Sequence, residues 1–163
     1  VPPWLELDTL WRFKLDAENA GLDAKWQEKA WNETEGWEKI RTDEFWENQA
    51  GDESTLSQET RNKLKRYDGI AWYATQCCVP QELKGRKIFL RFGAVDESCW
   101  VYVNGKLAGQ HIYEKSNDWK TPFEIPMDQF IDWNKADQLV IVRVEDKAGV
   151  GGIWRPVWIV SKK

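Results

Sequence analysis

From residue 69 onward the sequence consists of short runs in which apolar and polar residues alternate, and this pattern constrains the fold most strongly. Alternation with a period of two is typical of strands that bury one face, and Gly, Pro or Asn separates the runs. No run has the spacing of a strand–helix–strand unit, so we predict an all-β fold, an antiparallel β-sandwich of the jelly-roll type. With one earlier run, the predicted strands cover residues 11–15, 70–79, 87–92, 99–103, 107–111, 122–125, 138–145 and 153–161.

Asn104 and Gly105 form the strongest turn signal in the chain. A type I′ turn needs positive φ at both central residues, and these two residue types tolerate it best. The runs on either side are therefore predicted to pair as a hairpin.

The first third of the chain is polar, rich in Trp and rich in turn residues. Residues 16–36 are predicted to form a loop with one helical turn. A solvent-exposed helix is expected within residues 47–66, where Thr55 resembles the first residue of a capping box. We therefore predict a single domain, in which a strand, loops and a helix at 1–66 pack on the main strands at 67–163.

The chain contains 12 Trp among 163 residues, which is several times ordinary usage and excludes disorder. Trp in the first third are expected to anchor that segment onto the sandwich. The aromatic residues of the strand runs that we expect in the core are Trp72, Phe89, Phe92 and Trp158.

The charge balance excludes several classes of partner. The formal net charge is −4, whereas nucleic acids and anionic membranes favour a basic patch. No apolar run approaches the roughly 18 residues of a membrane helix, and the first residues lack the basic-then-apolar pattern of a signal peptide. We expect neither nucleic acid nor membrane as a partner.

The three cysteines, Cys77, Cys78 and Cys99, carry little functional signal. They have no Cys-x-x-Cys spacing and only one His accompanies them, so no zinc site is expected. We interpret them as small, partly buried hydrophobic residues, with a disulfide to Cys99 only if the protein is exported.

We expect no cofactor. A calcium ion in the loops would need several oxygen ligands, and the side chains available for it are Asp96, Glu97, Glu145 and Asp146. Because no calcium-loop spacing is present, no metal ligands are assigned from the sequence.

Seven motifs, in order along nearly the whole chain, match one known family. The segments are Trp11-Arg12-Phe13, Trp37–Ile40 with Phe45-Trp46-Glu47, Tyr67–Tyr73, Leu90–Asp96, Val101–Gly105, Thr121–Glu124 and Gly151–Val157. In these segments the sequence resembles the N-terminal sugar-binding domain of glycoside hydrolase family 2, a jelly-roll domain of the galactose-binding type found in β-galactosidases and β-glucuronidases.

The resemblance implies a non-catalytic domain. In this family both catalytic carboxylates lie in a downstream TIM barrel, and the neighbouring Asp96 and Glu97 are interpreted here as a turn. The expected function is binding of a polysaccharide or oligosaccharide, with a bacterial origin and an extracellular or periplasmic location. The alternative is a structural domain that braces a glycosidase barrel and has no sugar affinity of its own.

The first candidate sugar-binding surface is an outward sheet face. Aromatic rings stack on sugar C–H groups and planar polar side chains bind hydroxyls. Alternation places Trp100, Tyr102, Arg91 and Arg143 opposite the aliphatic core side, and together they resemble an open carbohydrate cleft. Alternatively, the Trp-rich N-terminal segment covers this face and the Arg residues stack on Trp.

The second candidate surface is a set of loops at one end. One loop, residues 111–120, holds Asp118 and Trp119 and begins with His111, the only histidine. In the family, the loop at this position approaches the active site of the barrel. His111 has the chemistry of an acid–base group, but no Ser or Cys motif accompanies it.

The other loop of this surface runs from Asp146 to Trp154. Glucuronidase-like members use an Asp six residues before the Gly of a Gly-Ile-x-Arg motif to touch the substrate, and Asp146 lies six before Gly152. The hypothesis is that Asp146, Trp119 and Trp154 form a rim that contacts sugar. The alternative is that Asp146 caps a turn and Trp154 is packed as structure.

Overall fold

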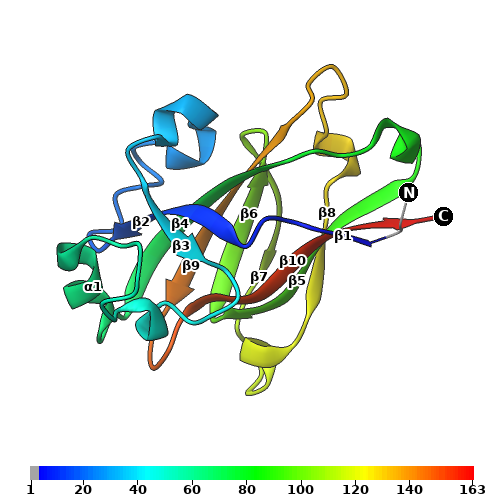
Figure 1. Cartoon of the computed structure of the whole chain (residues 1–163). Coiled ribbons are helices and arrows are strands. Elements are labelled where there is room, and N and C mark those ends of the chain that lie inside the picture. The colour runs from blue at the N-terminus through cyan, green and yellow to red at the C-terminus, as the bar shows by residue number, and fades with distance from the viewer. Residues whose placement is uncertain (1–3) are drawn as a thin grey trace.

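A computed structural model describes residues 4–163 and shows two antiparallel sheets packed face to face (Figure 1). The smaller sheet has the strand order β1 (Trp4–Glu6), β10 (Gly152–Lys162), β5 (Lys87–Asp96) and β8 (Phe123–Pro126). The larger has the order β3 (Glu38–Arg41), β2 (Leu10–Asp16), β4 (Gly69–Cys77), β9 (Gln138–Asp146), β6 (Ser98–Val103) and β7 (Lys106–His111). The predicted β-sandwich is confirmed.

The helical elements are short. The α-helix is α1 (Gln58–Leu64), and the 3₁₀ turns are η1 (Trp26–Glu28), η2 (Trp31–Thr34), η3 (Glu47–Gln49), η4 (Gln81–Leu83), η5 (Asp118–Lys120) and η6 (Asp128–Phe130). Across residues 4–163, no helix has the length and apolar composition that crossing a bilayer requires.

The core lies between the two sheets and follows the predicted alternation. Every second residue of β5, β6 and β9 faces inward and is buried, because a period of two sends one side of each strand to the core. The inward side chains of these strands include Ile88, Leu90, Phe92, Val101, Val103, Val140, Val142 and Val144. Cys77 and Cys99 are buried and Cys78 is exposed, all three as free thiols.

The predicted hairpin joins β6 to β7 through Asn104 and Gly105, whose φ angles are 50° and 84°. Both values lie in the left-handed region that the turn requires. The Asn104 side chain also donates to the carbonyl of Phe130 and to Oε1 of Gln138, each at 2.8 Å. This residue therefore shapes the turn and ties it to the segment before β9.

The helix lies inside the predicted range but begins at a different residue. Ser57, rather than Thr55, is the N-cap, and its Oγ accepts a hydrogen bond from the backbone N–H of Thr60. Thr55 instead donates to the carbonyl of Lys39. The carboxylate of Glu38 accepts hydrogen bonds from Ser57 and Thr60 and so holds the start of the helix on β3.

The N-terminal third is more deeply built into the sandwich than predicted. It supplies β1 to the smaller sheet and both β2 and β3 to the larger one. Its Trp residues also cover the outer face of the larger sheet, where Trp26 packs at a tilt against Trp37 and edge-on against Trp72. Asp16 accepts hydrogen bonds from the indole of Trp72 and the backbone of Gly21, which fixes this cover to the sheet.

Candidate functional site

Three of the predicted sheet-face residues share the outer face of the larger sheet. Trp100 lies opposite Arg143 in the β6–β9 register, and the Arg143 guanidinium stacks 4.6 Å from the Trp100 ring. Arg143 also donates to Oδ1 of Asn19 at 3.1 Å, while Tyr102 stacks on Trp72. These side chains are held by one another and by the N-terminal cover, as the alternative interpretation of this face expects.

The prediction that Arg91 shares this face was wrong. Arg91 is on β5 in the smaller sheet, where it donates to Oε2 of Glu124 and lies 5.1 Å from the Trp4 ring. Alternation shows on which side of its own strand a residue lies, but not to which sheet the strand belongs.

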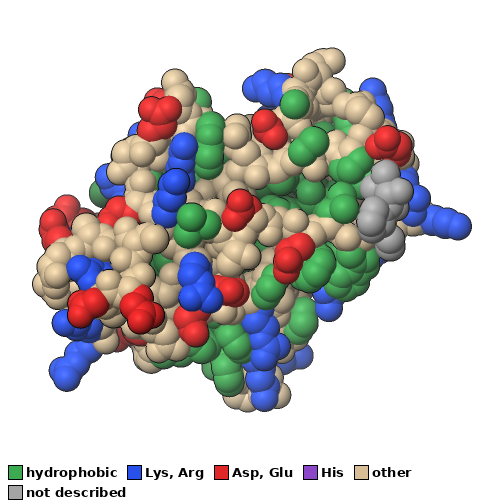
Figure 2. Space-filling view, in the orientation of Figure 1, with side chains coloured by type: hydrophobic (Ala, Val, Ile, Leu, Met, Phe, Trp, Pro, Cys, Tyr) green, Lys and Arg blue, Asp and Glu red, His purple; other side chains and the backbone are tan. Residues whose placement is uncertain are grey.

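Two aromatic residues expected in the core, Phe89 and Trp158, lie instead on the outer face of the smaller sheet. Phe89 and Trp158 are half-buried there, next to Trp4, whereas Trp72 and Phe92 are buried. Figure 2 shows hydrophobic side chains among single acidic and basic ones where β1, β10 and β5 lie in Figure 1. Alternation places Phe89 on the same side of its strand as Arg91 and opposite Phe92, so the expectation that Phe89 lies in the core was wrong.

An aromatic stack lies at the end of the sandwich that the sequence predicted as a rim. Trp154 stacks on Trp119 with ring centroids 5.6 Å apart, and its indole N–H donates to the carbonyl of Trp119 at 2.8 Å. Phe45 stacks on Trp154 at 4.6 Å, and the Arg155 guanidinium lies 4.3 Å from the Trp154 ring. Phe45, Trp119 and Trp154 are named here the aromatic stack. Phe45 was missed because it is more than a hundred residues away from Trp154 in sequence.

His111 and Asp118 serve the shape of the loop between β7 and β8. The His111 ring stacks on Phe123 at 4.1 Å, and burial lowers its pKa. Asp118 accepts hydrogen bonds from the backbone of Glu114 and Lys115, each at 2.8 Å, and these bonds lower its pKa. Both side chains are therefore occupied with their own loop.

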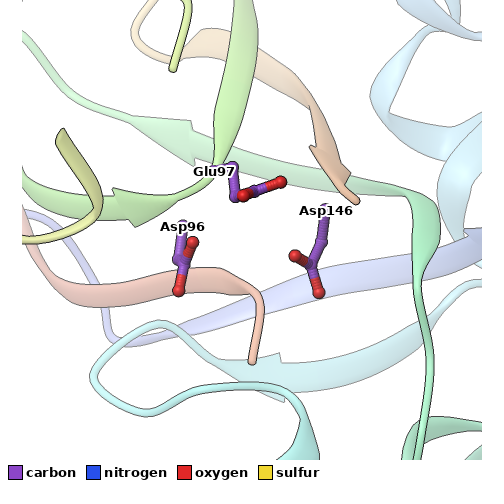
Figure 3. Close-up of side chains that lie close together, drawn as sticks. All are labelled: Asp96, Glu97 and Asp146. Atoms are coloured by element: carbon purple, nitrogen blue, oxygen red, sulfur yellow. The ribbon is translucent and has the colours of Figure 1, made fainter. Parts of the chain in front are cut away.

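Three acidic side chains converge at the same end of the sandwich. Asp96, Glu97 and Asp146, named here the acidic cluster, come from the ends of β5 and β9 and each offers one oxygen within 4.8 Å of the other two (Figure 3). Asp96 is 7% exposed and Asp146 only 1%. Asp146 also accepts from the backbone N–H of Ala148 at 3.3 Å, which caps the loop between β9 and β10.

Burial and mutual repulsion perturb these carboxyl groups strongly. Burial, with the charges of Glu97 and Glu47, raises the pKa of Asp96 to about 7. Burial, with the charges of Glu47 and Asp96, raises the pKa of Asp146 to about 9. Burial and the neighbouring negative charges both disfavour the ionised forms of Asp96 and Asp146, so ionising all the carboxyl groups of the acidic cluster together is unfavourable.

Residues 45–47 connect the aromatic stack to the acidic cluster. Phe45 touches Trp154, and Trp46 packs against the backbone at Gly151, whose carbonyl accepts from the Trp46 backbone N–H. Glu47 accepts from the backbone N–H of Gly151 at 2.9 Å. The stack and the cluster therefore lie at the same end of the sandwich, away from the two termini (Figure 1).

Comparison with known families decides the classification. Residues 5–160 match the family described as glycosyl hydrolases family 2, sugar binding domain. The chain belongs to this family. The match covers the sandwich from β1 to β10, in agreement with the order of motifs along the sequence.

Individual relatives of this family 2 domain are larger proteins. A β-galactosidase of Thermoanaerobacter pseudethanolicus is 28% identical over 111 residues, which cover 60% of this chain and 14% of the relative. The structure of Ruminococcus gnavus β-glucuronidase superposes with a TM-score of 0.79 at 19% identity, over 97% of this chain and 28% of that one. Lactobacillus rhamnosus β-glucuronidase gives a TM-score of 0.77 at 22% identity, again over 97% and 28%. The chain thus spans less than a third of these proteins, and the structural likeness shows a shared fold.

Proposed function

We propose that this family 2 domain is a non-catalytic carbohydrate-binding domain that contacts sugar through the aromatic stack at the loop end. The observation that carries the proposal is the arrangement of Trp119 and Trp154, which are stacked on each other at this end and are only half-buried. Aromatic faces stack on the C–H groups of sugar rings. Asp146, predicted together with them, is 1% exposed and lies within the acidic cluster.

The relatives suggest which sugars to test and what the domain works with. Those compared above are named as a β-galactosidase and β-glucuronidases, so galactosides and glucuronides are the first ligand classes to examine. The expected partner is a catalytic domain of the same polypeptide, with the sugar held between the two. In that arrangement the domain supplies part of the wall around the glycoside.

We assign no catalytic role to the acidic cluster. Retaining glycosidases need two carboxyl groups about 5 Å apart, one with a raised pKa, and the cluster meets that distance. However, Asp96 and Asp146 are both buried among the strand ends, and a glycosidic bond must reach the space between the two groups.

The structural alternative has one specific observation in its favour. Of the 12 Trp, all within the described residues, Trp4 alone is classed as exposed, at 45%. Most aromatic surface is therefore used in packing, as expected of a domain that braces a barrel without binding sugar itself.

Affinity gel electrophoresis separates the two functions. The chain is run through gels containing xylan, mannan, mixed-linkage glucan, galactan or alginate. We expect retardation by one or two polysaccharides, lost in Trp119→Ala and retained in Trp100→Ala. Absence of retardation in every gel, with a native near-UV circular dichroism spectrum, would support the structural alternative.

A further inference from the structure

The acidic cluster has no counter-charge within the described part of the chain. Salt bridges form elsewhere, but none involves Asp96, Glu97, Asp146 or the adjacent Glu47. Glu97 accepts a single hydrogen bond, at 2.7 Å, from the backbone N–H of Lys147. The three side chains of the acidic cluster therefore meet, with Glu47 nearby, without a salt-bridge partner among residues 4–163.

Two of the four acidic side chains, Asp146 and Glu47, each bury an oxygen that has no hydrogen-bond partner among the described residues. Asp96 is 7% exposed. Asp146 is 1% exposed and its Oδ2 is unpartnered, as is Oε2 of Glu47. Figure 3 shows the Asp146 carboxyl group turned toward the space it shares with Asp96 and Glu97. Burying polar oxygens without partners is costly, so this geometry indicates a missing positive ligand.

The spacing of the oxygens fits one cation. Calcium binds oxygen at 2.3–2.6 Å, so ligands on opposite sides of the ion are at most about 5 Å apart. The three oxygens of the cluster lie within 4.8 Å of one another. One ion placed among them can therefore contact all three side chains.

We propose that Asp96, Glu97 and Asp146 bind a calcium ion, with Glu47 next to it as a further oxygen donor. The ligands are all oxygens, which excludes the nitrogen and sulfur preference of zinc and copper. Calcium accepts irregular sets of carboxylates and completes its shell with water, whereas magnesium demands near-ideal octahedral geometry. The ion would join the ends of β5 and β9 and stiffen the β9–β10 loop beneath the aromatic stack.

The calcium site goes beyond the proposed function and does not rest on it. Its ligands all come from this domain, so binding is measured in the absence of sugar. Loss of sugar binding with calcium binding intact would refute only the proposed function.

The test is isothermal titration calorimetry of calcium chloride into the chelator-treated chain, with melting curves at matched calcium concentrations. We expect one calcium per chain and a higher melting temperature. Asp96→Asn and Asp146→Asn are expected to weaken binding roughly 10-fold or more and to remove the shift in melting temperature. Glu145→Gln changes the neighbouring acidic residue of β9, which lies outside the cluster, and is expected to bind calcium like the parent chain.

As a control for folding, the variants and the parent chain are also compared in the chelator-treated state. Without calcium, Asp146→Asn is expected to have a melting temperature equal to that of the parent chain or higher. The substitution removes a buried ionisable group, and no bound ion is lost in this state. No binding heat and no melting shift for the parent at millimolar calcium would overturn the proposal. So would a shift that survives in both Asp→Asn variants, or a response to magnesium chloride as large as that to calcium.

Discussion

Single residues determine how closely the β9–β10 loop approaches its neighbours. Gly151 and Gly152 lie against Trp46, and Gly152 has a φ of 102°, which favours glycine. Their lack of side chains lets the Trp46 ring, which is fully buried, contact the loop backbone. This contact holds the aromatic stack and the acidic cluster at one end of the sandwich.

Gly151→Ala is therefore predicted to destabilise the domain. The added Cβ would lie 2.5 Å from Cζ2 of Trp46 and 2.7 Å from Oδ2 of Asp146. Overpacking of this kind costs about 1–3 kcal/mol in the free energy of unfolding. Chemical denaturation measures the loss, with Gly51→Ala as the control because a Cβ there meets nothing within 4 Å. Equal stability of the two variants would contradict the described packing.

The acidic cluster also shows what alternation can predict at single positions. Inward positions 88, 90 and 92 on one strand, and 140, 142 and 144 on another, were identified from sequence. Continuing each series in steps of two reaches Asp96 and Asp146, both buried. The strands predicted from the sequence ended at residues 92 and 145, before Asp96 and Asp146. The alternation that extends to these two residues was therefore not part of the prediction. The two strands belong to different sheets, so the meeting of Asp96 and Asp146 depends on how the two sheets pack on each other, which no local pattern contains.

At the scale of elements, the strands after residue 69 were predictable and those before it were only partly so. The long strands alternate visibly and end at turn residues. In contrast, β1 and β3 have three and four residues, too few to show a period. β1 owes its existence to pairing with β10, where Trp4 lies opposite Val160. Such a strand is defined by its distant partner rather than by its own sequence.

The start of α1 is predicted to depend on pH through Glu38. Burial raises the pKa of Glu38, but hydrogen bonds from Thr60 and Ser57 outweigh it and lower the pKa below 4.5 overall. A carboxyl group whose pKa is lowered in the folded state stabilises the fold at pH values above its unfolded-state pKa. This stabilisation is lost as the pH falls through the folded-state pKa. Glu38→Gln should therefore lower the melting temperature at pH 7, with a smaller deficit below pH 4.5. A deficit that stays constant across this range would contradict the assigned role.

The N-terminal cover is predicted to depend on Asp16. Its carboxylate accepts from the Trp72 indole at 2.9 Å and from the backbone of Ala20 and Gly21 at 2.7 and 2.9 Å. Asp16→Ala leaves buried donors unpaired, which costs about 1–3 kcal/mol each, and should make residues 17–36 sensitive to protease. Limited proteolysis checks this against Asp23→Ala, an exposed carboxylate of the same segment. Unchanged cleavage would show that other contacts hold the cover.

For the whole molecule, the family and the sandwich followed from the order of motifs along the chain, whereas the three-dimensional grouping of the site residues did not. The candidate residues divide among three surfaces: the covered face of the larger sheet, the outer face of the smaller sheet, and the loop end. Of these, the loop end joins an aromatic stack to unpartnered carboxyl oxygens. The central claim is that sugar binds at this end.

Nuclear magnetic resonance of the Trp indole N–H groups tests that claim most directly. The 12 indoles include reporters in the core and on all three surfaces, and that of Trp154 donates within the aromatic stack. The chain is titrated with an oligosaccharide of the polysaccharide that retards it. We predict the largest shift changes at Trp119 and Trp154, with Trp72 and Trp100 unchanged. Changes confined to Trp100 or Trp4, or no change at saturating sugar, would contradict the account.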